Sequence, residues 1–298
     1  MNYFVIGMAG SGKSTLVRTL QQRLSNPFII NLDPAIQTLA YVPDVDIRDS
    51  VDYDQLTSTS KLGPNGAILT ALNLFVTKLD QLANVIPDNR PIVFDSPGQI
   101  ESFIWSASGE ILLKTFPGAV LYVTDAKKAV NPSIFVSSML YLLGVQQRLN
   151  ITEIIVVMNK SDLLNSDLTD EFKQILSENE ETGESELDLV QLFAKNSLVL
   201  TDSFKFQAEN DYQGSFLSNV TLYLDRFWQK NKYCFVSCKK GTGIDTLINE
   251  MERVQKNTVV EEKAKDEKYA AEKKEKQAKE KEKFEQEFND HRNMDEND

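Results

Sequence analysis

The sequence has few of the residues that bind transition metals or form disulfides. Its 298 residues include two cysteines, Cys234 and Cys238, and one histidine, His291. Two thiols are too few for a disulfide framework or a four-cysteine zinc site, and the histidine lies in a polar stretch. We therefore expect no structural transition-metal site.

Long apolar runs and dense basic clusters are also missing. No apolar stretch approaches the roughly 20 residues that cross a bilayer, and the sequence opens on a strand-like run without a charged signal region. The 44 acidic residues outnumber the 32 lysines and arginines, which gives a net charge of −12. This charge opposes contact with nucleic-acid phosphates and anionic lipids. We expect a soluble, cytoplasmic protein that binds neither nucleic acid nor membranes directly.

Short β-branched runs alternate with longer amphipathic stretches along most of the sequence. This pattern predicts an α/β fold, a three-layer sandwich with a mostly parallel sheet covered by helices. We predict strands at residues 2–6, 28–32, 91–95, 119–125, 153–158 and 233–237. Polar motifs follow five of these strands, at the carboxyl edge where open parallel sheets bind ligands.

The first of these motifs predicts nucleotide binding. Residues 7–14 read Gly-Met-Ala-Gly-Ser-Gly-Lys-Ser, a complete phosphate-binding loop. Glycines let backbone N–H groups converge on the β-phosphate, the lysine reaches the β- and γ-phosphate oxygens, and the last serine hydroxyl binds Mg²⁺. The residues expected at the phosphates are Gly10, Ser11, Gly12, Lys13, Ser14 and Thr15. The strand before the loop and the helix after it indicate a P-loop NTPase; the alternative is a glycine-rich turn without a ligand.

A second motif, Asn159-Lys160-Ser161-Asp162, indicates that the base is guanine. The Asp162 carboxylate can accept from N1–H and N2–H of guanine, two donors that adenine does not present together. A buried acceptor left unpaired costs about 1–3 kcal/mol, so this site would reject adenine. Lys160 can lay its aliphatic stem on the purine, while Asn159 braces the phosphate loop. The alternative is a polar turn in which Asp162 caps the next helix.

The loop that ends the last predicted strand completes this base site. In Ser237-Cys238-Lys239 we expect the backbone N–H groups near Cys238 and Lys239 to face guanine O6. Cys238 itself is then a small packing residue rather than a reactive thiol.

Two further acidic loops predict hydrolysis. In Asp95-Ser96-Pro97-Gly98-Gln99 we expect Asp95 to hold Mg²⁺ through a water, the Gly98 N–H to contact the γ-phosphate, and Gln99 to orient the attacking water. Asp33, which follows another strand, could polarise that water or hold Mg²⁺ through a shell water. The alternatives are a Pro-Gly turn and an Asp-Pro turn.

One stretch, Leu62-Gly63-Pro64-Asn65-Gly66, has no evident role within a single chain. Asn65 could form a tight turn and cap the helix suggested by the apolar residues Ile68, Leu72, Phe75, Val76 and Leu79. Together with Asn31-Leu32-Asp33-Pro34-Ala35, Asp46-Ile47-Arg48-Asp49, Asp95-Ser96-Pro97-Gly98-Gln99-Ile100-Glu101 and the two nucleotide motifs above, it resembles the GPN-loop GTPases. The resemblance covers roughly residues 1–260 and is strongest to the first paralogue of the eukaryotic family.

This resemblance implies a dimer formed through the nucleotide-facing side. The Gly63-Pro64-Asn65 loop of each subunit would reach the other active site and place Asn65 near the γ-phosphate or the attacking water. Asp33, Asp95, Gln99 and Glu101 fall on the Mg²⁺ and water-positioning residues of the family. The resemblance also implies a role in assembly and nuclear import of RNA polymerase II. The partners would then be a second copy or a sister paralogue and polymerase subunits or assembly factors, and the protein would shuttle to the nucleus.

Composition suggests four segments. We predict a GTPase core at residues 1–162, a helical insertion at 163–232, the rest of the core at 233–260 and a charged, exposed helical tail at 261–298. Apolar residues of the insertion favour a packed helical lobe. The alternative is a groove for an apolar client segment, formed together with Val136, Met139, Leu140 and Leu143.

The competing functional interpretation is a P-loop kinase or other transferase that acts on a small molecule, with Asp33 as general base. The guanine-reading Asp162 and the Gln99 motif favour a GTP-hydrolysing switch protein instead.

Overall fold

The computed structural model describes residues 1–59, 62–87, 89–151, 153–207, 216, 219–222, 227 and 230–254. Contacts between residues divide the chain into two units, Met1–Glu252 and Arg253–Asp298. The fold and the site below belong to the first unit. The predicted tail at 261–298 lies outside the described residues.

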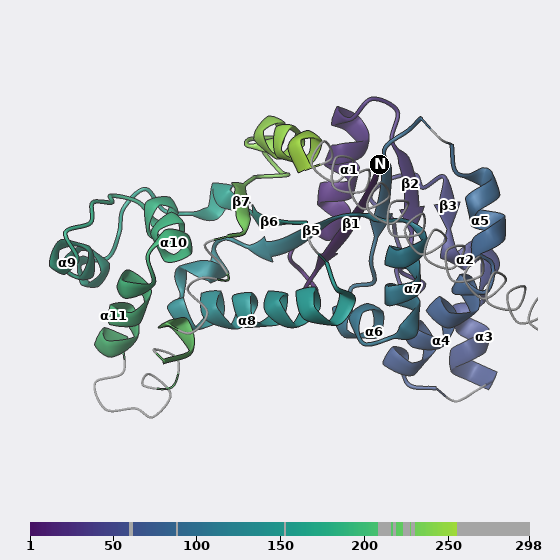
Figure 1. Cartoon of the computed structure of the whole chain (residues 1–298), viewed down its shortest axis with the longest axis horizontal. Coiled ribbons are helices and arrows are strands. Elements are labelled where there is room, and N and C mark those ends of the chain that lie inside the picture. Colours follow the sequence, from purple (N-terminus) through teal and green to yellow (C-terminus); the bar gives the residue numbers. More distant parts are fainter. Residues whose placement is uncertain are drawn as a thin grey trace, which may run out of the picture. The chain divides into compact units, whose positions relative to one another are not determined.

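The first unit is built on a seven-stranded sheet in which every described strand pairing is parallel. The order across the sheet is β3-β2-β4-β1-β5-β6-β7 (Figure 1). The strands are β1 Asn2–Gly7, β2 Phe28–Asn31, β3 Val45–Asp46, β4 Ile92–Asp95, β5 Gly118–Asp125, β6 Ile154–Asn159 and β7 Lys232–Phe235. Strand β1 lies between β4 and β5, so the phosphate loop at its end occupies the middle of the carboxyl edge.

The six predicted strands are present, and the sequence missed a seventh. Strand β3 is only two residues long and therefore too short to show a period. Strand β7 ends at Phe235 rather than 237, because the Ser237 N–H bonds the Thr242 carbonyl across a turn at 3.0 Å.

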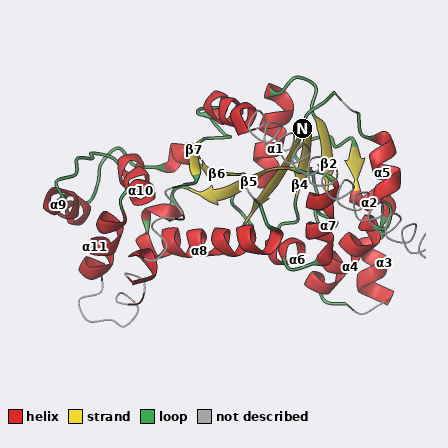
Figure 2. Ribbon diagram, in the orientation of Figure 1, coloured by secondary structure: helices red, strands yellow, loops and turns green. Residues whose placement is uncertain are grey.

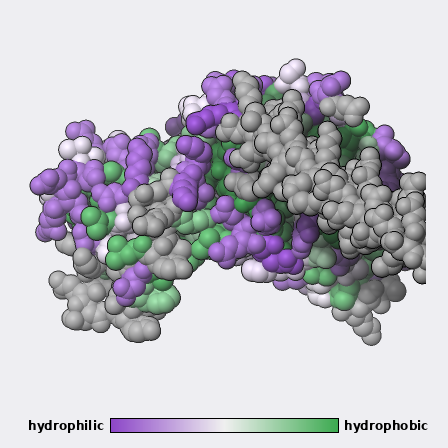
Figure 3. Space-filling model, viewed as in Figure 1, coloured by the Kyte–Doolittle hydropathy of each residue, from purple (hydrophilic) through white to green (hydrophobic). Residues whose placement is uncertain are grey.

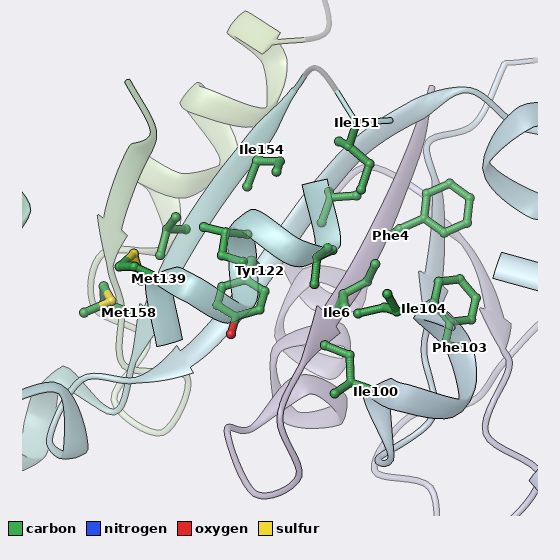
Figure 4. Close-up of a cluster of buried hydrophobic side chains, with 14 of the residues drawn as sticks. Phe4, Ile6, Ile100, Phe103, Ile104, Tyr122, Met139, Ile151, Ile154 and Met158 are labelled. Carbon is green, nitrogen blue, oxygen red and sulfur yellow. The ribbon is translucent and has the colours of Figure 1, made fainter. Parts of the chain in front are cut away.

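One face of the sheet packs against a layer of helices. Alternate residues of a strand point to opposite faces, and Phe4, Ile6, Phe94 and Tyr122 belong to one continuous buried cluster. Figure 4 shows this cluster where β1 and β5 meet helices α6 (Ile100–Ile104) and α8 (Pro132–Leu149). Helices α4 (Pro64–Val76) and α7 (Ala107–Thr115) add further side chains to it.

The neighbouring strand residues form the opposite face. Tyr3, Val5, Val123 and Val157 are buried but lie outside that cluster. Helix α1 (Lys13–Arg23) supplies buried side chains here, as does the helix that follows β7; these are Leu16, Val17, Leu20, Ile244, Leu247 and Met251. Two helical layers thus enclose the sheet, which confirms the three-layer sandwich (Figure 2).

Smaller helices complete the core. They are α2 Ile47–Ser50, α3 Tyr53–Thr59, α5 Leu79–Val85, and the 3₁₀ turns η1 Lys128–Val130 and η2 Ser161–Leu163. None of the helices in the described part of the chain has the length and apolar character needed to cross a bilayer. Hydrophilic side chains cover much of the described surface in Figure 3.

The described residues of the predicted insertion between β6 and β7 include helices α9 Asp170–Glu178, α10 Glu186–Lys195 and α11 Ser197–Gln207. Helix α10 begins with a capping box formed by Ser185 and Asp188. Phe193 of α10 packs edge-on against Phe135 of α8, with ring centroids 5.7 Å apart. Val136 and Met139 of α8 are fully buried, so these two residues cannot line a client groove.

Candidate functional site

The phosphate loop has a backbone that requires glycine at two positions. Gly10 and Gly12 adopt φ angles of 77° and 96°, a left-handed conformation that disfavours other residues. A Cβ at Gly12 would also collide with the Asn159 amide. The loop therefore packs closely against Asn159, the last residue of β6 and the first of the base motif.

Lys13 lies beneath this loop with its side chain buried. Its Nζ donates to the carbonyls of Gly7 at 2.8 Å and Met8 at 3.3 Å. Burial lowers the pKa of Lys13, and the charges of Asp95, Asp33 and Glu101 oppose that shift. The charges of the predicted lysine and of the predicted carboxylates therefore interact.

Asp95 is the most enclosed of these carboxylates. Its side chain is 1% exposed, and Oδ2 accepts a 2.8 Å hydrogen bond from the hydroxyl of Tyr41. Burial raises the pKa of Asp95 to about 6, although hydrogen bonds from Tyr41 and Ser14 and the charge of Lys13 counteract it. The sequence did not identify Tyr41.

Three buried side-chain oxygens around the loop lack a hydrogen-bond partner: Ser11 Oγ, Asp95 Oδ1 and Ser96 Oγ. An unpaired buried polar group typically costs about 1–3 kcal/mol. Such atoms are rare in native proteins, and several at one edge of a sheet are typical of a ligand site. A carboxylate and hydroxyls suit a hydrated cation and phosphate oxygens.

Asp33 links the loops after β2 and β4. Its Oδ2 accepts from the Gly98 N–H at 2.9 Å and its Oδ1 from the Ala35 N–H at 3.0 Å. Asn31, fully buried, accepts from the Asp33 N–H at 3.0 Å. The Gly98 amide predicted to contact a phosphate is therefore bonded to Asp33, and it can reach a phosphate only after that bond opens.

The Asp46-Ile47-Arg48-Asp49 motif, to which the sequence gave no role of its own, anchors the loop that carries Asp33. Both oxygens of Asp46 accept from the Arg48 guanidinium, the shortest contact being 2.7 Å. Arg48 Nη1 also donates to the carbonyl of Ile36 at 3.0 Å. The Arg48 guanidinium therefore connects the loop at residues 33–44 to the start of α2.

We expect Arg48→Ala to lower the free energy of unfolding by about 1–2 kcal/mol at pH 7 and by less at pH 3. Burial alone would raise the pKa of Asp46, but hydrogen bonds from Arg48 and Asn31 outweigh it and lower that pKa below its usual value. A lowered pKa contributes stability above the unfolded-state value and loses it as pH falls through the folded-state value.

Urea unfolding at both pH values, with the same measurement on Arg148→Ala, tests this. Arg148 forms a half-exposed pair with Glu110, for which we expect a smaller effect. An equal loss at pH 7 and pH 3 for Arg48→Ala would contradict the prediction.

Asn159 joins three loops of the site. Its Nδ2 donates to the Ser11 carbonyl at 3.0 Å, and its Oδ1 accepts from the N–H groups of Lys160 at 2.8 Å and Cys238 at 3.3 Å. The side chain thus braces the phosphate loop and connects it to both loops of the predicted base site.

Lys160 reaches back to the phosphate loop from a left-handed backbone, with φ of 64°. Its Nζ lies 2.7 Å from the carbonyl of Gly10 and 2.7 Å from Asp125 Oδ2. Asp125 ends β5, the one internal strand end at which the sequence had predicted no functional residue. Its position at the carboxyl edge was the available signal.

Asp162 is oriented by the loop after β7. Ser237 Oγ donates to its Oδ1 at 2.5 Å, and this bond, with nearby lysine charges, lowers the pKa of Asp162. The alternative role as a helix cap is wrong, because the N-cap of α9 is Thr169. A cavity of about 240 Å³ opens at Asp162; its lining also includes Gly12, Thr15, Asn159, Lys160, Leu163, Cys238 and Lys239.

Cys238 lines this cavity as a packing residue. Burial raises the pKa of its thiol to about 11, so the thiol is protonated near neutral pH. This agrees with the prediction that it is not a reactive nucleophile.

Three predicted catalytic side chains lie at the surface. Gln99 is the N-cap residue of α6 without a capping bond, and Glu101 stands in the first turn of that helix. Asn65 is exposed in the first turn of α4. The N-cap of α4 is Gly63, with Pro64 following it, so the expectation that Asn65 caps the helix is wrong.

A second, larger cavity of about 530 Å³ is lined by another part of the phosphate loop. Its walls are residues 8–11, the end of β5 and the part of α8 up to Tyr141, including Tyr122, Thr124, Ser133 and Ser137. Residues of the phosphate loop therefore line both cavities.

Comparison with known proteins shows the family. A family model described as "Conserved hypothetical ATP binding protein" matches residues 5–257. The chain is 34% identical to GPN-loop GTPase 1 of Dictyostelium discoideum over 265 residues, 84% of this chain and 60% of that protein. It is 35% identical to GPN-loop GTPase 1 of Schizosaccharomyces pombe over 256 residues, 82% of this chain and 66% of that protein. The chain thus spans less than two thirds of the length of these relatives.

A crystal structure of a GTPase in apo form from Pyrococcus abyssi has the same fold. It superposes with a TM-score of 0.66 at 24% identity, covering 86% of this chain and 97% of that one. The family model, the relatives and the loops described above agree, and the chain belongs to the GPN-loop GTPase family.

Proposed function

We propose that the protein binds GTP and hydrolyses it to GDP and phosphate. The carrying observation is the Asn159 side chain, which bonds the phosphate loop through Ser11 and the last base loop through Cys238. These bonds connect the loop that carries Lys13 with the two loops around Asp162, which supports our assignment of the first to the phosphates and of the others to guanine. Its family membership agrees with this assignment.

We include Mg²⁺ in this proposal. Ser14 and Asp95, with Asp33 through a shell water, would hold the ion, and the unpaired Asp95 Oδ1 fits this role. The described residues contain no group of three or more His, Cys, Asp or Glu side chains placed to bind a metal. The ion would therefore take most of its ligands from phosphate oxygens and water, as Mg²⁺ prefers. When bound, it would neutralise charge on the β- and γ-phosphates.

The other predicted catalytic residues would position the attacking water and the γ-phosphate and would not react themselves. Gln99 and Glu101 would orient the attacking water, and Gly98 would contact the γ-phosphate after its amide leaves Asp33. A neutral amide is sufficient for this role, because phosphoryl transfer depends mostly on positioning and charge stabilisation.

Nucleotide hydrolysis by the purified full chain tests the proposal. We expect Mg²⁺-dependent phosphate release from GTP and little from ATP. The competing function is a small-molecule kinase, for which the cavity beside residues 8–11 would have to accept the second substrate. Transfer of the phosphoryl group to an added metabolite, with none released to water, would favour that function and contradict ours.

We further propose that the working form is a dimer in which Asn65 acts in trans. Its exposed side chain, at the start of a helix, is free to enter the site of a second subunit. We expect Asn65→Ala to keep GTP affinity and lower turnover about 100- to 1,000-fold, as when one preorganised hydrogen-bond donor is removed.

Mixing variants tests action in trans. Asn65→Ala subunits retain a complete phosphate loop, and Lys13→Ala subunits retain the loop with Asn65. Mixed dimers should therefore regain one competent site. If the turnover of the mixture is no higher than the sum of the turnovers of the two separate variants, this mechanism is excluded. If Asn65→Ala alone has unchanged turnover, the Gly63-Pro64-Asn65 loop has only a structural role.

On the resemblance to the eukaryotic first paralogue, we propose that GTP turnover controls assembly and nuclear import of RNA polymerase II. The partners would be a sister paralogue or second copy and polymerase subunits or assembly factors, with shuttling between cytoplasm and nucleus. Affinity purification of the chain with GDP and with a non-hydrolysable GTP analogue tests this. Failure to recover polymerase subunits in either state would contradict it.

A further inference from the structure

Tyr41 is a buried tyrosine whose hydroxyl bonds the Asp95 carboxylate of the site. The residue is 6% exposed, and its hydroxyl donates to Asp95 Oδ2 at 2.8 Å. No sequence motif includes it, because it lies eight positions beyond Asp33 in an irregular loop. Ser14, in the phosphate loop, is a second hydrogen-bond donor to this carboxylate.

Backbone contacts on both sides hold Tyr41 in place. Gln21 Nε2 donates to the carbonyl of Val42 at 2.6 Å, and Asp44 Oδ2 accepts from the Ile29 N–H at 2.8 Å. Arg48 binds the carbonyl of Ile36 earlier in the loop at 3.0 Å. The loop therefore does not depend on the phenol hydroxyl for its position, and removal of that hydroxyl should leave the aromatic ring where it is.

The two oxygens of Asp95 have different surroundings. Oδ2 accepts from Tyr41, whereas Oδ1 is buried without a hydrogen-bond partner. A carboxylate with no fixed donor can rotate and exchange its two oxygens, whereas a donor on one oxygen selects a single orientation. Partners of this kind typically change metal affinity 10- to 100-fold when they are removed.

We infer that Tyr41 is a positioning residue for Asp95: its hydroxyl fixes the carboxylate so that Oδ1 stays available to the hydrated Mg²⁺ of the nucleotide complex. This inference rests on the proposed binding of guanine nucleotide with Mg²⁺. It assigns to the loop after β2 a part in cation affinity that is separate from the role of Asp33.

Tyr41→Phe tests the inference, because it removes the hydroxyl and keeps the ring. The probe is a fluorescent GDP analogue, released from the protein at a series of free Mg²⁺ concentrations. We expect the Mg²⁺ concentration that half-maximally slows release to rise about tenfold. Release in excess chelator should be unchanged, and turnover should recover when Mg²⁺ is raised to saturation.

Tyr3→Phe is the matched control. Tyr3 is equally buried on the opposite face, and its hydroxyl donates to a backbone carbonyl, that of Met251, at 3.3 Å. It should release nucleotide with the Mg²⁺ dependence of the unmodified protein. In an Asp95→Asn background, Tyr41→Phe should have no further effect on that dependence.

Two results would overturn the inference. One is an unchanged Mg²⁺ midpoint in Tyr41→Phe; the other is faster release in chelator as well, which would show a general structural role. If the unmodified protein shows no Mg²⁺-dependent retention of the GDP analogue, the proposed function fails together with this inference. The behaviour of the unmodified protein therefore separates the two kinds of failure.

Discussion

Replacing Lys13 with alanine is expected to lower GTP turnover by about a thousandfold, since removal of one preorganised hydrogen-bond donor typically costs about 10²–10³ in rate and this donor is also charged. The ammonium is buried under the loop and bonded to the carbonyls of Gly7 and Met8, and the charges of Asp95, Asp33 and Glu101 favour its protonated form. No other described lysine is buried at the end of the central strand in this way. Alanine would leave the carboxylates without a compensating cation at the phosphates.

Phosphate release at saturating GTP, together with binding of a fluorescent nucleotide, measures the effect. Lys114→Ala is the control, because Lys114 is an exposed lysine whose Nζ lies 2.7 Å from Glu110. We expect that variant to retain full turnover, since exposed ion pairs contribute little. Turnover of Lys13→Ala within tenfold of the unmodified protein would show that the loop does not bind the transferred phosphate.

The sequence was sufficient to locate the residues at the ends of the strands. Local apolar runs identified β1, β2, β4, β5, β6 and β7, and all of these except β5 are followed by a predicted polar motif at the same edge. This succeeded because a parallel sheet brings its carboxyl ends together whatever the details of packing. Lys13, Asp95 and Asp162 could therefore be placed near one another before any coordinates were known.

The partners of those residues could not be predicted in this way. Tyr41 and Asp95 are 54 residues apart in sequence, and Lys160 and Asp125 are 35 apart. Such pairs depend on how a loop folds over the sheet, and neither propensity nor periodicity contains that information. The bond from the Gly98 amide to Asp33 was missed for the same reason.

Asn65 marks another limit. The sequence left two possible roles for this side chain, and one of them, capping the helix, is wrong, because the helix starts at Pro64 and uses Gly63 as its N-cap. Proline is favourable at the first helical position because its missing N–H would be unpaired there anyway. Because Asn65 does not cap the helix, its exposed side chain can contact another molecule.

Replacing Asp162 with asparagine is expected to lower affinity for GDP and GTP by about 100-fold and to raise affinity for the xanthine nucleotides. Ser237 Oγ donates to Oδ1 of Asp162 at 2.5 Å. In the variant this hydroxyl would select the amide oxygen, so the amide nitrogen would take the place of Oδ2 in the cavity. A donor there opposes the N1–H and N2–H of guanine, whereas the C2 carbonyl of xanthine can accept from it.

Competition of GDP and XDP against a fluorescent guanine nucleotide measures the change, with Asp170→Asn as control because Asp170 is fully exposed on α9. The role of Ser237 gives a sharper test. In Asp162→Asn, a second substitution Ser237→Ala frees the amide to rotate, which should restore part of the guanine affinity and reduce the preference for xanthine. An unchanged preference in the double variant would show that Ser237 does not set the orientation, and an unchanged GDP affinity in Asp162→Asn would show that Asp162 does not bind the base.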